Sequence, residues 1–329
     1  MCAFLKRLFA FRRTLLVVSV LFLLLILSFL IKESHQDVIV LQYAEHPALD
    51  QVRRGISDYM EKCCSSYSIM YESAQADPTL ASQLAQKIYA KNPKLVVTIG
   101  TLAAQAFLKK EEMNVIFSSI TDPVAAGLAK SFEEPGMHFT GVSNFPDIEQ
   151  ELSMIELVIP NVKRIGLLYN TGEVNSNSIA TRLKDIAAQR WLEIVEVTAN
   201  STKDMISAVK SLAGKVDVIY ITNDNTALSA LQGITRASNE AGIPVFCSDT
   251  DTIGMGIVAA FGPDQYGIGV QTAKMIEKFL ESDCISCDIP KTPIQISGSF
   301  KLKIDKRIAR KLGIEIRPEA LSIAGEVIE

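Results

Sequence analysis

Short apolar runs rich in β-branched residues alternate with longer amphipathic stretches along most of the chain. The apolar runs are uncharged or nearly so, which predicts strands buried on both faces of a parallel sheet. The amphipathic stretches between them, such as residues 48–62, 102–110 and 124–132, predict helices that return the chain between strands. The predicted strands are DVIVLQYA (37–44), LVVTIG (95–100), VIFSSI (115–120), RIGLLYN (164–170), WLEIVEV (191–197), VDVIYIT (216–222) and IPVFCSD (243–249).

The alternation is interrupted at three places, which predicts two α/β lobes joined by a three-crossing hinge. The interruptions are TGVSNFPD (140–147), GMGIVAAFGPDQYG (254–267) and the segment around IPKTPIQIS (289–297), where glycine and proline break the pattern. We therefore expect one lobe from residues 37–143 plus 262–290, and a second from residues 144–261 plus 291–329. Each lobe is expected to be Rossmann-like, with a parallel sheet.

The N-terminus has a different pattern. Lys6, Arg7, Arg12 and Arg13 precede an uncharged apolar run over residues 14–31. As a helix, this run would be about 27 Å long, close to the roughly 30 Å of a bilayer's hydrocarbon core. The basic residues predict that residues 1–13 stay in the cytoplasm and that the soluble part lies outside it. We predict an uncleaved single-pass anchor in the cell membrane; the alternative is a signal sequence whose cleavage would release a secreted protein.

Composition and charge narrow the function. The chain has 329 residues, a formal net charge of −4 and an isoelectric point near 5.6, which argues against a nucleic-acid partner because phosphate binding requires a basic face. Six cysteines are too few for a disulfide scaffold in a chain of this length. Cys284 and Cys287 have C-x-x-C spacing, which leaves plain structural cysteines, a local disulfide, or a redox or metal role as alternatives.

Several predicted strands are followed by polar residues at the point where a helix begins. In open parallel sheets, ligands bind at these carboxyl-end junctions, so a shared cleft is expected. Since helix caps use the same residue types, capping is the alternative for each, but clusters such as NSNS and NDNT exceed the one cap that a helix needs. The junction residues are Thr101, Thr121, Asp122, Glu173, Asn175, Ser176, Ser178, Asn223, Asp224, Asn225, Thr226, Ser248, Asp249 and Asp251.

These junctions predict a site for a small zwitterion. The hydroxyl groups of Thr101, Thr121 or Ser176, beside helix N-termini, suit a carboxylate. Asp224 is the first candidate to bind an ammonium group, and Glu173 is the second. Aromatic side chains near strand ends or crossings are candidates to cover an apolar ligand body, with packing as the alternative; they are Phe145, Tyr169 and, as the preferred pair, Tyr43 and Phe261.

Motifs for catalysis are not found. The sequence has no G-x-S-x-G, P-loop or H-E-x-x-H, and its three histidines are His35, His46 and His138. His46 could contact a ligand, although a capping or surface role is the alternative. We therefore predict a protein that is not an enzyme, with no cofactor and no bound metal.

Several blocks of the sequence resemble one known family. They are LQYAEHPALDQVRRGISDYM, TIGTLAAQAF, SSITDPVAAGL, TGVSN, IPNVKRIGLLYNTGEVNSNS, VIYITNDNTALSAL and GVQTAKMI followed by KLGIEI. Their order and spacing, from about residue 38 to 329, are similar to those of ABC-transporter substrate-binding proteins of the tryptophan/tyrosine type. The resemblance implies a type I periplasmic-binding-protein fold and ligand contacts at Thr101, Thr121, Asp122, Asn175, Ser176, Asp224 and Asn225.

The resemblance also implies partners. Proteins of this kind deliver a small solute to a membrane permease and its ATPase, and relatives bind aromatic amino acids. One departure is the N-terminal helix, because family members are usually lipoproteins or freely secreted. We expect an extracytoplasmic solute-binding protein for an amino acid-like ligand; the alternatives are a ligand-sensing ectodomain of a membrane signalling complex and a secreted α/β enzyme using Asp224 or Asp249.

Overall fold

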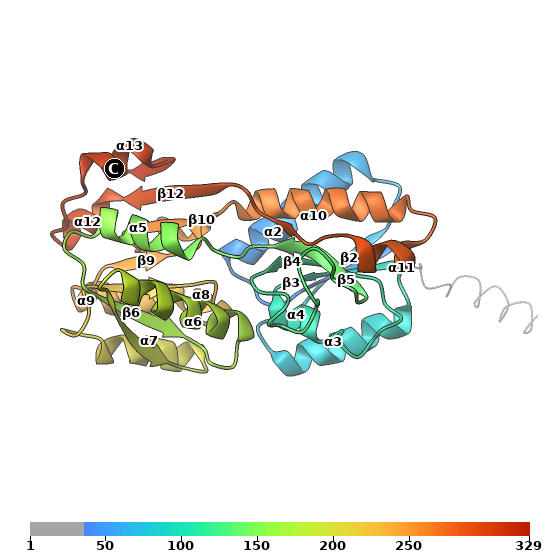
Figure 1. The fold of residues 1–329 in the computed structure, drawn as a ribbon, viewed down its shortest axis with the longest axis horizontal. Coiled ribbons are helices and arrows are strands. Elements are labelled where there is room, and N and C mark those ends of the chain that lie inside the picture. The colour runs from blue at the N-terminus through green and yellow to red at the C-terminus, as the bar shows by residue number, and fades with distance from the viewer. Residues whose placement is uncertain (1–35) are drawn as a thin grey trace, which may run out of the picture. The chain divides into compact units, whose positions relative to one another are not determined.

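The computed structural model describes residues 36–329, of which 37–329 form one compact unit (Figure 1). The first lobe contains a six-stranded sheet in the order β11-β5-β4-β3-β1-β2, in which every neighbouring pair is parallel. The strands are β1 (Val38–Gln42), β2 (Ile69–Ser73), β3 (Leu95–Ile99), β4 (Val115–Ile120), β5 (Phe139–Ser143) and β11 (Gln295–Ile296).

Helices cover both faces of this sheet. The helices α2 (Pro47–Cys63) and α10 (Gln265–Leu280) lie on one face, and α3 (Pro78–Lys91) and the short α4 (Thr101–Gln105) lie on the other (Figure 1). The central strands β1, β3 and β4 are buried along their whole length, as the uncharged runs predicted. The chain continues after α10 through α11 (Ile285–Asp288) and a 3-10 turn, Ile289–Lys291.

The second lobe contains a seven-stranded sheet in the order β13-β12-β10-β9-β8-β6-β7. All pairs are parallel except β10 with β12, which is antiparallel because β12 returns from the other lobe. Its elements are α5 (Ile148–Val158), β6 (Arg164–Tyr169), α6 (Val174–Gln189), β7 (Glu193–Thr198), α7 (Thr202–Ser211), β8 (Val218–Ile221), α8 (Asn225–Ser229), α9 (Leu231–Glu240), β9 (Val245–Cys247), η1 (Thr250–Thr252), β10 (Ala259–Pro263), β12 (Phe300–Asp305), α12 (Lys306–Lys311), α13 (Pro318–Ile323) and β13 (Glu326–Ile328).

Separate apolar cores lie on the two faces of the second sheet. One core packs α5 and α6 against the sheet, and the other packs α7, α8 and α9. The first lobe has its own core around β1, β3 and β4. The prediction of two α/β lobes with parallel sheets is confirmed, with the β10–β12 pair as the one antiparallel exception among the described strands.

The chain passes between the lobes after β5, after β10 and after β11. The second passage follows Pro263, the last residue of β10, because β10 pairs with β9 and β12 along its whole length. The third follows Ile296, because β11 pairs with β5 of the first lobe. The expected boundaries at residues 261/262 and 290/291 therefore fall a few residues too early, since strand pairing extends past the glycine and proline signals.

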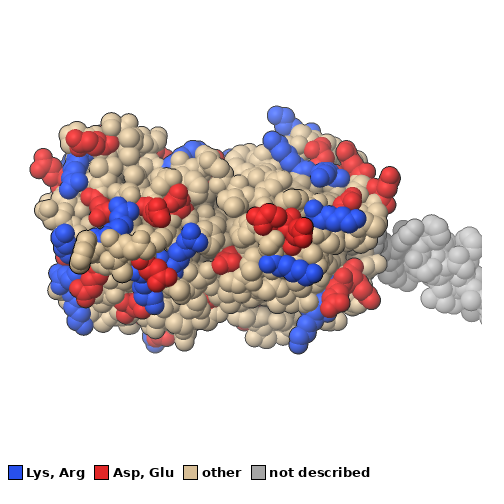
Figure 2. Space-filling view, in the orientation of Figure 1, with Lys and Arg blue, Asp and Glu red and all other residues tan. Residues whose placement is uncertain are grey.

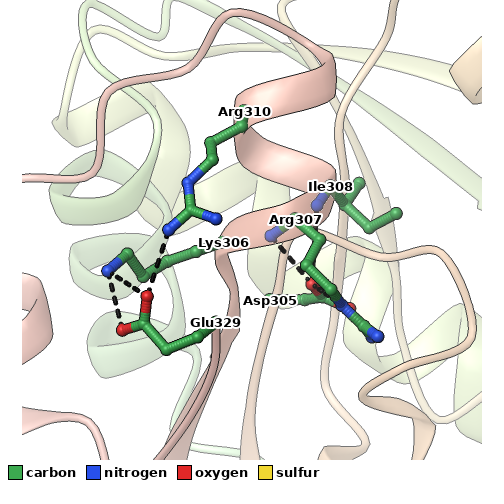
Figure 3. A network of polar contacts seen from close by, with 6 residues as sticks. All are labelled: Asp305, Lys306, Arg307, Ile308, Arg310 and Glu329. Carbon is green, nitrogen blue, oxygen red and sulfur yellow. Dashed lines mark hydrogen bonds and ion pairs between the residues drawn. The ribbon is translucent and has the colours of Figure 1, made fainter.

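The last strand is held by ion pairs between α12 and Glu329 (Figure 3). Asp305 caps this helix by accepting hydrogen bonds from the backbone N–H groups of Arg307 and Ile308, and the Arg307 side chain pairs with the same carboxylate. Lys306 and Arg310 both contact the Glu329 carboxylate, at 2.7 Å and 3.1 Å. These contacts attach β13 to the edge of the second sheet.

Two smaller expectations have definite outcomes. Residues 124–132 form turns rather than a helix, with the Leu128 N–H bonded to the Pro123 carbonyl, because Asp122 and Pro123 start a turn that Gly127 ends at a φ of +73°. Cys284 and Cys287 form a disulfide within the α11 segment, so the disulfide alternative is the one observed.

Two kinds of feature are absent from residues 36–329. No helix in this part of the chain is long and apolar enough to cross a membrane, and it contains no cluster of three candidate metal ligands. The basic segment 1–13 and the predicted anchor at residues 14–31 lie outside the described residues. Acidic and basic side chains are interspersed over both lobes on the face shown in Figure 2.

Candidate functional site between the lobes

A small cavity lies between the carboxyl ends of the two sheets. The walls come from both lobes and from the hinge, so the cavity depends on their being close together. Its lining residues are His46, Ala48, Leu49, Gly100, Thr101, Ser119, Thr121, Asn144, Asn175, Asn223, Asn225, Leu228 and Gln265.

Five of the predicted junction residues line this cavity, as does His46; the five are Thr101, Thr121, Asn175, Asn223 and Asn225. Thr101 begins α4 and Thr121 follows β4 in the first lobe, and both are buried. Asn175 is the second residue of α6 and Asn225 is the first residue of α8, so both come from the second lobe. The strand-to-helix junctions of opposite lobes therefore converge, as the rule for parallel sheets predicts.

Asp224 and Ser176 are buried behind the cavity and do not line it. The Asp224 carboxylate accepts hydrogen bonds from Asn170 N (2.7 Å), Ser176 Oγ (2.6 Å) and Ala227 N (2.7 Å). Asp224 is thus the N-cap of α8 and also fixes the loop after β6. Burial, and then the charge of Glu173, raises the pKa of the Asp224 carboxyl group.

Glu173 connects the same two loops. Its carboxylate accepts hydrogen bonds from the backbone N–H groups of Asn225 (3.1 Å) and Thr226 (3.0 Å), from Asn225 Nδ2 (2.7 Å) and from Thr226 Oγ1 (2.8 Å). It is 1% exposed. Together with Asp224, it holds the α6 and α8 junctions in one arrangement, and this explains why these loops contain more polar residues than capping requires.

The remaining candidates lie elsewhere. The Tyr43 hydroxyl donates to the Ala76 carbonyl at 3.1 Å, and the Phe261 ring stacks on Phe300 at 5.8 Å within the second lobe's core. Asp122 accepts a hydrogen bond from Ser178 Oγ of the other lobe at 2.6 Å, outside the cavity. Phe145, Tyr169, Ser248, Asp249 and Asp251 do not line the cavity either.

Ser119 lines the cavity and was not predicted from the sequence. It lies at an irregularity in the pairing of β4 with β5 and has a left-handed backbone, with φ +56°. A bulge of this kind redirects a side chain out of the regular alternation of the strand. Its hydroxyl donates to Gln265 Oε1 at 3.0 Å, at the first turn of α10. A pattern of alternating residues gives no signal for such a position.

The N-terminus of α2 also lines the cavity. Pro47 is its first residue, and the next two, Ala48 and Leu49, have N–H groups without intrahelical acceptors. His46, the N-cap, gives no side-chain cap bond within the described residues and is only 4% exposed. Instead its Nε2 lies 3.2 Å from Asn225 Oδ1 of the other lobe. Burial lowers the pKa of His46, which favours the neutral ring.

The lining of the cavity therefore suits a small ligand with little net charge. Among its lining residues in the described part of the chain, none is Asp, Glu, Lys or Arg. Donors are provided by the α2 N-terminus and by hydroxyl and amide groups, and Ala48, Leu49 and Leu228 provide apolar surface. Two α/β lobes enclosing such a cavity at a three-crossing hinge define a binding protein of the two-lobed type.

Comparison with known proteins gives the family. Residues 37–328 match the family described as ABC transporter substrate binding protein, and the chain belongs to this family. The recognition made from the sequence is thereby confirmed. A curated relative, the "Tyrosine-binding protein" of Clostridioides difficile (strain R20291), is 31% identical over 267 residues, which cover 80% of this chain and 77% of the relative.

Three solved structures are also similar. A conserved domain protein from Vibrio cholerae is 37% identical with a TM-score of 0.85, covering 89% of this chain and 100% of that one. An ABC domain in complex with L-Trp from Streptococcus pneumonia is 32% identical with a TM-score of 0.85, covering 90% and 100%. The ligand-free, open structure of a substrate-binding protein with adhesive properties from Clostridium difficile is 28% identical with a TM-score of 0.66, covering 89% and 99%.

Proposed function

We propose that this protein is the extracytoplasmic solute-binding component of an ABC importer and that it captures an aromatic amino acid between its two lobes. The main support is the cavity, where the strand-to-helix junctions of both lobes meet the N-terminus of α2. None of the described residues that line it is Asp, Glu, Lys or Arg. The relatives named for tyrosine binding and for a complex with L-Trp support the ligand class.

The carboxylate end of the ligand would lie at the first-lobe wall. Its carboxylate would accept hydrogen bonds from the N–H groups of Ala48 and Leu49 and from the hydroxyl group of Thr101, whereas the Thr121 hydroxyl donates to Asn144 Oδ1 at 3.2 Å. The ligand's side chain would then lie against the apolar lining that includes Leu228. The permease and its ATPase are the proposed partners, and the protein is not proposed to catalyse a reaction.

A ligand screen tests this function directly. The proteins solved from Vibrio cholerae and Streptococcus pneumonia align over their full length with about nine tenths of this chain, so residues 37–329 are suitable as a soluble protein. We expect L-tyrosine or L-tryptophan to raise its melting temperature most among the twenty L-amino acids, because a ligand that binds only the folded state stabilises it. Calorimetry should then give a Kd of micromolar order, about −8 kcal/mol. No shift with any amino acid would contradict the proposal.

We also propose that residues 14–31 tether the protein to the membrane, with the soluble part outside the cytoplasm. The support is the length and apolarity of the run and the four basic residues before it. Cells expressing the full chain should retain it in the membrane fraction after alkaline extraction. A shortened protein in the medium or periplasm would show instead that the segment is cleaved.

A further inference from the structure

Two buried acceptor atoms, one from each lobe, belong to residues that line the cavity. They are His46 Nδ1 in the first lobe and Asn175 Oδ1 in the second, and neither has a hydrogen-bond partner among residues 36–329. Both residues are at least nine-tenths buried. Because a buried unpaired polar atom costs about 1–3 kcal/mol, the pair indicates a ligand that donates hydrogen bonds.

The orientation of the Asn225 amide follows from its neighbours. The Glu173 carboxylate accepts hydrogen bonds from two backbone N–H groups and from the Thr226 hydroxyl. The Thr226 hydroxyl in turn accepts a hydrogen bond from Asn170 Nδ2 at 2.9 Å. The Glu173 carboxylate therefore acts only as an acceptor. The Asn225 atom 2.7 Å from it must be the donor Nδ2, which leaves Asn225 Oδ1 facing His46.

This orientation determines the histidine tautomer. Since Asn225 Oδ1 can only accept, the proton of the neutral His46 ring lies on Nε2. Nδ1 is then unprotonated and can only accept. The buried Glu173 carboxylate thus orients the Asn225 amide, and this amide determines which ring nitrogen of His46 is protonated.

The amide of Asn175 is oriented in a similar way. Its Nδ2 donates to the Asn223 carbonyl oxygen at 2.8 Å and lies 3.3 Å from Glu173 Oε2. Both partners only accept, so the amide nitrogen must face them. The carbonyl oxygen Oδ1 is the atom that remains unpartnered.

We infer that His46 Nδ1 and Asn175 Oδ1 together accept the ligand's ammonium group and make the protein select amino acids over acids that lack an amine. This inference rests on the proposed function and specifies which atoms recognise the ligand's cationic end. Each lobe supplies one acceptor, so the ammonium group bridges the cleft. Asp224, whose oxygens already accept three hydrogen bonds, serves to position the loop rather than to bind the amine.

The assignment has a pH signature. Protonation would place a hydrogen on Nδ1, converting an acceptor into a donor and adding a positive charge beside the ammonium group. The charged groups that face His46 are Asp50 of α2 and Glu173 of the opposite lobe, and both favour the protonated ring, whereas burial opposes it more strongly. Because burial lowers the pKa of His46 below its ordinary value of about 6.5, affinity for an amino acid should be full at pH 6.5 and above and should decrease only at lower pH.

The test compares each amino acid with its analogue lacking the amine. Titration calorimetry would use residues 37–329 with L-tyrosine and 3-(4-hydroxyphenyl)propionate, and with L-tryptophan and indole-3-propionate. We expect His46→Leu and Asn175→Ala each to reduce the preference for the amino acid by about 10-fold, equivalent to about 1.4 kcal/mol, while binding of the analogue changes less than about 3-fold. His138→Leu, the same substitution at a half-buried histidine away from the cavity, should leave the preference unchanged.

The outcomes separate the two proposals. Equal weakening of the amino acid and its analogue in both variants would overturn the ammonium assignment and leave the proposed function intact. Stronger amino-acid binding by the wild type at pH 5 than at pH 7 would also overturn it. If the wild type binds no amino acid, the proposed function fails and this inference fails with it. If His46→Leu does not fold, Asn175→Ala and the wild-type pH profile decide the matter.

Discussion

At the scale of single residues, burial separates side chains that look alike in the sequence. Asn175, Ser176, Asp224 and Asn225 all occupy polar junctions, but only the two asparagines line the cavity. Asp224 satisfies the capping alternative, since it accepts a hydrogen bond from Ala227 N, and it also binds the loop after β6. A single carboxylate with both functions should matter for stability and for ligand affinity.

We therefore predict that substitutions of two aspartates differ in their effect on ligand affinity. Asp224→Ala should lower amino-acid affinity at least about 10-fold and reduce the free energy of unfolding by about 1–3 kcal/mol, because three donors lose their acceptor. Asp251→Ala, whose side chain does not line the cavity, should leave affinity nearly unchanged. Calorimetric titration and thermal unfolding of both variants measure this. Wild-type affinity in the Asp224 variant would contradict both the scaffold role and an ammonium contact.

At the scale of elements, helix α2 carries its N-terminus to the cavity because it packs unusually close to α10. A Cβ atom at Gly269 of α10 would lie 2.1 Å from the Val52 carbonyl oxygen of α2, and one at Gly55 would lie 2.3 Å from the Tyr266 carbonyl oxygen. Both glycines are needed for this approach, although glycine weakens a helix. The first residue of α10, Gln265, also lines the cavity, so the two helices position one wall together.

Gly269→Ala should consequently destabilise the protein, although glycine-to-alanine changes inside helices usually stabilise by up to about 1 kcal/mol. The backbone oxygen of Val52 cannot move without shifting α2, so we expect a loss of about 1–3 kcal/mol. Gly267→Ala is the matched control on the same helix, because its Cβ would meet only the Asp264 side chain, at 3.1 Å. Urea unfolding of both variants measures the difference; equal stability would show that the helices can separate freely.

At the scale of the whole molecule, the lobes are joined directly as well as through the hinge. Ser178 Oγ donates to Asp122 Oδ2 at 2.6 Å, and His46 Nε2 meets Asn225 Oδ1 at 3.2 Å, so two hydrogen bonds cross the cleft. The TM-score is 0.85 to the complex with L-Trp and 0.66 to the ligand-free, open structure, over nearly equal shares of this chain. The arrangement of the lobes is therefore more similar to that of the L-Trp complex than to that of the open structure.

The contact between Ser178 and Asp122 should favour closure without touching the ligand. Ser178→Ala removes one hydrogen bond to a carboxylate, about 1 kcal/mol or slightly more, and so should shift the ligand-free population toward the open form. We expect an increased radius of gyration by small-angle X-ray scattering and an affinity about 3- to 10-fold lower. Ser207→Ala, an exposed serine within the second lobe, serves as the control. Unchanged scattering and affinity would show that the contact does not influence closure.

The sequence by itself determined the two α/β lobes, the parallel sheets and the polar junctions, because strand and helix periodicities and glycine and proline interruptions are local properties of the chain. Tertiary structure decided which polar residues reach the cavity. The Asn225 amide is oriented by Glu173, 52 residues away, and contacts His46, 179 residues away. The direction of the Ser119 side chain depends on a bulge, and the directions of Tyr43 and Phe261 depend on packing. Such contacts form between distant segments only when both lobes have folded and closed, so no local pattern encodes them.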